Sequence, residues 1–145
     1  MSRKRIKCKK DKVPCRSLCE KLPRDLFSDT EYVWWYDAEY PHNRGWCITI
    51  RVLLERGWNF DSSKCIPAPT VDELFEKFPA ILTGELRIIP TYYSLSNQWE
   101  VYAECPTWNS AVNAKGRTFV SAVCNLYLSL RKEFERGKKC IKHLF

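Results

Sequence analysis

Apolar residues near the C-terminal end of the chain recur at the spacing of an α-helix. They are Phe119, Val123, Leu126, Leu130 and Phe134. This period predicts an amphipathic helix from about Thr118 to Gly137. Because such a helix is stable only when another layer covers its apolar face, the chain needs a second layer of secondary structure.

Four segments rich in aromatic and β-branched residues are expected to form that layer as strands: 31–36, 46–52, 86–93 and 98–105. The last two are joined by the short turn 94–97, which predicts a hairpin. Pro90 indicates an edge strand or a bulge, since proline has no N–H to donate to a neighbouring strand. The polar segment 106–116 is expected to be a loop.

Two more helices are predicted before the last one. Residues 15–22 have helical spacing of apolar groups, and Thr70 with Glu73 forms a capping box before a helix that ends ahead of Pro79. The order is therefore α-β-β-α-β-β-α. We expect an α+β fold in two layers, with one antiparallel sheet of about four strands covered by helices.

Basic charge is concentrated at the two ends of the 145-residue chain, whose net charge is +7. We expect a flexible basic arm over 1–12, a single α+β domain over 13–137 and a basic extension over 138–145. The ends either solubilise the protein or contact phosphates. No apolar run is long enough for a membrane span, and no secretory signal follows the basic start. These features favour a cytoplasmic protein without a membrane partner.

The chain has eight cysteines. In a reducing compartment they are expected to be free and mostly buried thiols, with no cofactor. The alternative is a zinc site that joins Cys15 and Cys19, on one helical face, to Cys140 and His143. Neither spacing matches a zinc finger.

The aromatic residues on the predicted strands either fill the core or form a ligand surface. For a nucleotide or a similar anion, the candidate residues are the stacking groups and arginines Trp34, Trp35, Trp46, Trp99, Arg44, Arg51, Arg87 and Arg117. No catalytic motif is present, and no catalytic residue is assigned. Glu100 and Glu104 share a strand face with Tyr102, which we interpret as a solvated polar face rather than an acid–base pair.

The block Ile66-Pro67-Ala68-Pro69-Thr70, with the helix that follows to Pro79, resembles a block in small proteins of tailed bacteriophages and prophages of gut bacteria. The resemblance extends over roughly residues 15–136 and supplies no binding or catalytic residues. It implies a phage accessory protein in the host bacterial cytoplasm. Such a protein would act by stoichiometric binding in counter-defence, either sequestering a nucleotide immune signal or blocking a host immune protein.

Two other functions stay open at this point. The basic ends are compatible with a nucleic-acid-binding regulator, and a small enzyme that degrades a signal would be recognised by turnover. Assembly into a homo-oligomer is also open.

Overall fold

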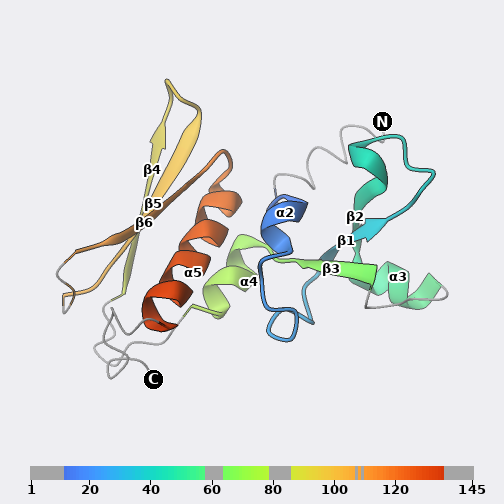
Figure 1. Cartoon of the computed structure of the whole chain (residues 1–145), viewed down its shortest axis with the longest axis horizontal. Coiled ribbons are helices and arrows are strands. Elements are labelled where there is room, and N and C mark those ends of the chain that lie inside the picture. The colour runs from blue at the N-terminus through green and yellow to red at the C-terminus, as the bar shows by residue number, and fades with distance from the viewer. Residues whose placement is uncertain (1–11, 58–63, 79–85, 107, 109, 136–145) are drawn as a thin grey trace. The chain divides into compact units, whose positions relative to one another are not determined.

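The computed structural model describes residues 12–57, 64–78, 86–106, 108 and 110–135. By its contacts the chain divides into two compact units, Met1–Glu73 and Leu74–Phe145. The α+β class is confirmed, but the expected single sheet is not present. Instead the described residues form two three-stranded antiparallel sheets, β2-β1-β3 and β4-β5-β6 (Figure 1). The single domain over 13–137 stays a prediction, because a division by contacts does not test independent folding.

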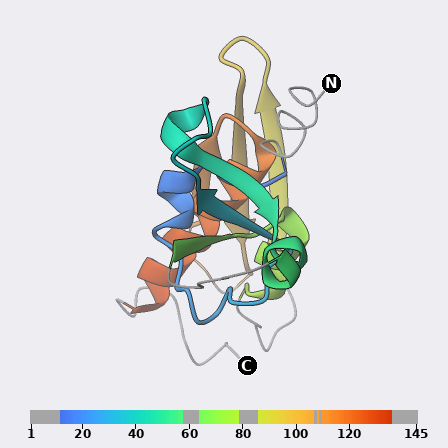
Figure 2. The same cartoon turned by 90° about the vertical axis from the view of Figure 1, so that its right-hand side faces the viewer.

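In the described part of the first unit there are one sheet and three short helical segments. Its described elements are α2 (Arg16–Cys19), β1 (Tyr32–Tyr36), the 3-10 helix η1 (Asn43–Gly45), β2 (Trp46–Ile50), α3 (Arg51–Gly57) and β3 (Cys65–Ala68). In Figure 2 the blue-green to green ribbons of β1, β2 and β3 lie side by side, as their pairing requires. The strand predicted at 31–36 is confirmed as β1, whereas the strand predicted at 46–52 ends at Ile50, because Arg51 begins the helix α3, which was not predicted. The first helix is shorter than expected.

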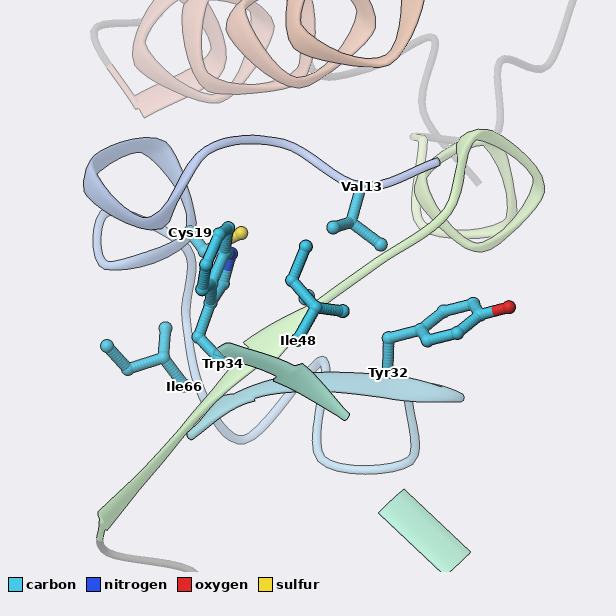
Figure 3. Close-up of a cluster of buried hydrophobic side chains, with 7 residues drawn as sticks. Val13, Cys19, Tyr32, Trp34, Ile48 and Ile66 are labelled. Atoms are coloured by element: carbon cyan, nitrogen blue, oxygen red, sulfur yellow. The ribbon is translucent and has the colours of Figure 1, made fainter. Parts of the chain in front are cut away.

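Side chains from one face of this sheet form the core of the first unit. Tyr32, Trp34, Ile48 and Ile66 are buried there with Val13 and Cys19 (Figure 3). The indole Nε1 of Trp34 donates a hydrogen bond of 3.1 Å to the carbonyl of Pro14. That bond satisfies the one polar group that the ring carries into the core.

The predicted capping box is confirmed at α4 (Val71–Glu76). The Glu73 carboxylate accepts a hydrogen bond of 2.8 Å from the backbone N–H of Thr70, whose hydroxyl accepts one of 3.3 Å from the N–H of Glu73. The second oxygen of Glu73 accepts a bond of 2.9 Å from the backbone N–H of Glu31. Glu73 therefore fixes the start of the helix and the residue that precedes β1.

The second unit packs one helix on a sheet. Its elements are β4 (Arg87–Tyr93), β5 (Gln98–Glu104), β6 (Val112–Gly116) and α5 (Phe119–Glu135). The β4–β5 hairpin is confirmed, and Pro90 lies on an edge strand in regular register. The yellow hairpin reaches past the end of β6 in both views (Figures 1 and 2). The Thr118 hydroxyl caps α5 by accepting a bond of 3.1 Å from the N–H of Ser121.

Two strands were not predicted from the sequence. The loop expected at 106–116 is wrong in its second half, because β6 adds to the hairpin with only Val112 and Ala114 buried. β3 carries Pro67 and pairs with β1 at the edge of its sheet. Both strands have too few β-forming side chains to be recognised from the sequence alone. They form because a neighbouring strand supplies backbone hydrogen bonds.

Candidate functional site

The β4-β5-β6 sheet has one face on α5 and one open face. Because side chains alternate along a strand, the buried Val101 and Ala103 mark the helix face, and Trp99 contacts Phe119 of α5 there. The opposite positions face away from the helix. We call seven of them the tyrosine face: Ile89, Thr91, Tyr93, Glu100, Tyr102, Asn113 and Lys115.

Glu100 lies at the centre of the tyrosine face and is only 6% exposed. The hydroxyls of Tyr93 and Tyr102 each donate a hydrogen bond of 2.9 Å to its Oε1. Asn113, on the neighbouring strand, donates from Nδ2 to the other oxygen, Oε2. Lys115 is paired with Glu100 across the two strands. Three donors from three strands therefore surround one buried carboxylate.

These contacts set the pKa values of the two central groups. The hydrogen bond from Tyr102 lowers the pKa of Glu100 most, burial raises it, and the bonds from Asn113 and Tyr93 and the charge of Lys115 lower it further. The bond to Glu100 is in turn the main reason that the pKa of Tyr102 is raised to about 12. At neutral pH, Glu100 is therefore ionised and Tyr102 is a neutral donor.

The arrangement orients side chains rather than moving protons. A general base needs a free lone pair near neutral pKa, whereas Glu100 is held ionised and already accepts three hydrogen bonds. A polar network whose members are all satisfied makes its surroundings rigid. Glu100 therefore fixes the rings of Tyr93 and Tyr102 on the open face. The expectation of a solvated carboxylate is wrong for Glu100.

A pocket of about 330 Å³ opens beside the tyrosine face, where β5 ends. Its lining residues come from the hairpin and from the segment between β5 and β6: Arg87, Glu104, Cys105, Pro106, Trp108, Ser110 and Ala111. Arg87 and Glu104 pair across the strands, with Nη1 of Arg87 3.4 Å from Oε1 of Glu104. The backbone N–H of Trp108 donates a bond of 2.9 Å to the carbonyl of Cys105, so Trp108 is held in a turn at the end of β5, and it lines the pocket.

Five predicted site residues lie in the first unit, and most are used by the fold. Trp34 is 3% exposed in the core, so its ring faces are not on the surface. The Arg16 guanidinium lies over the ring of Trp46, 4.8 Å from its centre, and the rings of Tyr36 and Trp46 make an edge contact. Arg51 donates bonds of 2.8 and 2.9 Å to Thr30.

The other two candidates of the first unit are Trp35 and Arg44. Trp35 is half-buried on the opposite sheet face from Trp34, as alternation predicts, and Arg44 is exposed at a backbone φ of 55°. The cation over Trp46 is thus Arg16, which was not among the candidates.

The three predicted residues of the second unit are not brought together. Trp99 is half-buried on the helix face, where its ring contacts those of Tyr92 and Phe119. Arg87 is on the opposite face of the sheet, at the pocket. Arg117 is exposed just before α5. Trp99 and Arg87 therefore do not share a ligand, whereas Trp108, which was not a candidate, lines the pocket with Arg87.

The zinc prediction rests partly on residues outside the described ranges, since Cys140 and His143 lie there. Cys15 is exposed, while Cys19 is buried and its thiol donates to the carbonyl of Pro14 at 3.4 Å. In the part of the chain that the structure describes, no group of three or more His, Cys, Asp or Glu side chains is placed to hold a metal ion. The buried position of Cys65, Cys105 and Cys124 agrees with the expectation of buried thiols.

Sequence reasoning missed the Glu100 cluster as a site. The shared face of Glu100 and Tyr102 was visible from their spacing, but Tyr93 and Asn113 come from two other strands, and β6 was not predicted. A glutamate between Trp99 and Val101, in the middle of the strand, was the available signal.

Comparison with protein-family models, curated proteins and solved structures finds no match. No helix among the described residues is long and apolar enough to cross a membrane.

Proposed function

We propose that this protein acts by stoichiometric binding of a folded protein partner through the tyrosine face and the adjoining hairpin tip. The observation that carries the proposal is the buried Glu100 carboxylate that holds Tyr93 and Tyr102 in place. Tyrosine is enriched among residues that dominate binding energies, because its ring combines a large contact area with a polar group.

Fixing these rings in advance lowers the cost of binding. An unrestrained side chain loses about 0.5–1.5 kcal/mol of conformational entropy when a partner immobilises it. Tyr93 remains 43% exposed although its hydroxyl is bonded, so its ring is both available and restrained. Burying the charge of Glu100 is unfavourable for folding. The rigid binding surface that results is a functional reason for the carboxylate to be there.

The hairpin adds apolar surface next to the tyrosine face. Leu95 at the turn is 102% exposed, and Ile89 is an exposed member of the tyrosine face, whereas the exposed Tyr92 lies on the helix face of the sheet against Trp99. Exposed apolar side chains gathered on one element are typical of protein interaction sites. The strand edges are less suited to a partner, because Pro90 interrupts the donors of β4 and Lys115 lies on β6.

The resemblance to phage and prophage proteins supports a biological setting for this binding. We propose a phage accessory protein in the host bacterial cytoplasm that blocks a host immune protein. The alternative, a nucleic-acid-binding regulator, depends on the basic ends, most of which lie outside the described residues.

Affinity capture with the full chain from lysates of gut bacteria tests the proposal. The wild-type chain is expected to retain one host protein at near-equal stoichiometry. Tyr93→Ala is expected to weaken that complex at least tenfold, and Tyr93→Phe less, since it keeps the ring and loses only the bond to Glu100. The exposed Glu39→Ala, in the first unit, is the matched control and should bind as wild type.

Capture that is unchanged in a folded Tyr93→Ala variant contradicts the proposal. Capture that is lost only when residues 1–12 are deleted, and that nuclease treatment abolishes, supports the nucleic-acid alternative instead.

A further inference from the structure

The pocket at the end of β5 is a second candidate site. Its lining residues differ from those of the tyrosine face. Its volume of about 330 Å³ is at the small end of the range of about 300–1,000 Å³ found for small-molecule sites. It therefore has room for one small ligand. Its lining combines a cation, a carboxylate, an indole and a hydroxyl.

Arg87 keeps most of its binding capacity at this pocket. A guanidinium has five N–H donors, and the ion pair of Arg87 with Glu104 involves one nitrogen, 3.4 Å from the carboxylate oxygen. The two side chains are 66% and 40% exposed, so their attraction is screened by water and contributes little to stability. An anionic ligand can therefore take up the remaining donors, and arginine binds phosphate oxygens in pairs.

Trp108 and Glu104 supply the other two contacts that a nucleotide needs. Trp108 lines the pocket, where a base can pack against its side chain. A carboxylate beside the pocket accepts hydrogen bonds from sugar hydroxyls, as acidic residues do in dinucleotide sites. Cation, indole and carboxylate thus match the phosphate, base and sugar of one nucleotide.

We propose that this pocket binds a single nucleotide unit, with the base against Trp108, the phosphate on Arg87 and the sugar on Glu104. The site differs from the tryptophans expected from the sequence, since Trp34 is in the core and Trp99 is on the other face of its sheet. Its size favours a mononucleotide over a dinucleotide signal.

Calorimetric titration of the purified full chain with AMP, GMP, CMP and UMP tests this site, with adenosine as the ligand that lacks a phosphate. At least one mononucleotide is expected to bind. Arg87→Gln should weaken its binding about tenfold or more and leave adenosine binding unchanged, because only the phosphate contact is removed. Trp108→Phe should weaken a nucleotide and its nucleoside alike. Arg117→Gln, which changes an exposed arginine away from the pocket, is the control.

Three outcomes overturn the site. These are no binding of any of the four mononucleotides at millimolar concentration, equal binding by the folded Arg87→Gln variant, and binding that disappears only on deleting residues 1–12. The measurement uses no host protein, so its failure is distinct from failure of the proposed partner. Tyr93→Ala should bind the mononucleotide as wild type.

Discussion

Glu100 shows how one side chain links stability to the proposed surface. A buried carboxylate is unfavourable unless hydrogen bonds replace its water, and here Tyr93, Tyr102 and Asn113 do so. Those bonds also hold the tyrosine rings. The same contacts therefore determine the pKa of the carboxylate and the rigidity of the face.

Removing the charge of Glu100 is expected to change the response to acid. The pKa of Glu100 is lowered in the fold, relative to about 4.3 in an unfolded chain. Its ionised form therefore stabilises the protein above that value, and this contribution is lost as the pH falls through the folded-state pKa. Urea unfolding from about pH 7 to pH 3 should show Glu100→Gln less stable at neutral pH, with the difference narrowing in acid.

The exposed Glu76→Gln provides the control and should follow wild type at every pH. A constant difference between wild type and Glu100→Gln across the range would contradict the assignment of the ionised carboxylate.

Tyr102 provides a matching test in alkali. Its pKa of about 12, raised mainly by the bond to Glu100, means that the stabilising neutral form is fully present below about pH 10 and is lost as the pH rises through the folded-state pKa. Tyrosinate absorbance should show one late-ionising group, absent in Tyr102→Phe. In Glu100→Gln, Tyr102 should ionise at a lower pH than in wild type. Ionisation of Tyr102 at an unchanged pH would contradict its hydrogen bond to Glu100.

The contact between β6 and α5 depends on a residue without a side chain. A Cβ added at Gly116 would lie 2.4 Å from the backbone nitrogen of Ala122 and 2.8 Å from the carbonyl carbon of Ser121. Both are backbone atoms of α5, so the helix would have to move. Asn125 adds to the contact by donating a bond of 2.8 Å to the carbonyl of Lys115.

Gly116→Ala is therefore expected to destabilise the protein by about 1–3 kcal/mol, the usual cost of overpacking. Chemical denaturation measures the change, with Ser96→Ala in the exposed hairpin turn as the control. A free energy of unfolding within about 0.5 kcal/mol of wild type would show that α5 does not approach β6 so closely.

The elements differ in how far their own residues specify them. The helix α5, the capped α4 and the β4–β5 hairpin were predicted close to their observed bounds, since each carries its period, cap or turn within a short segment. β3 and β6 were not, because a strand with a proline or with two small apolar residues forms only where a neighbouring strand supplies hydrogen bonds.

The charge of the whole molecule leads to a prediction about its ends. Residues 1–12 carry seven basic groups and one acid, and Val13 is the first buried residue of the described chain. Deleting 1–12 therefore removes charge and keeps the described core. If these groups contact phosphates, binding of random duplex DNA should weaken steeply with salt, and the deletion should reduce the logarithmic slope by up to about 6.

Replacing the exposed Lys21 and Lys77 with glutamine is the control for net charge, and should reduce that slope by no more than about 2. A slope that the deletion leaves unchanged would reject phosphate contact by the N-terminal segment.

The sequence by itself determined the α+β class, the hairpin, the capping box at Thr70 and the last helix, because periodicity, capping and turn chemistry act between residues close along the chain. The alternation of side chains along a strand also puts Trp34 and Trp35 on opposite faces. Only the tertiary structure decided that there are two sheets, that Trp34 is core, and that Glu100 is enclosed by Tyr93, Tyr102 and Asn113. The reason is that strand pairing and burial join residues far apart in the chain, and no local pattern records which strand lies beside which.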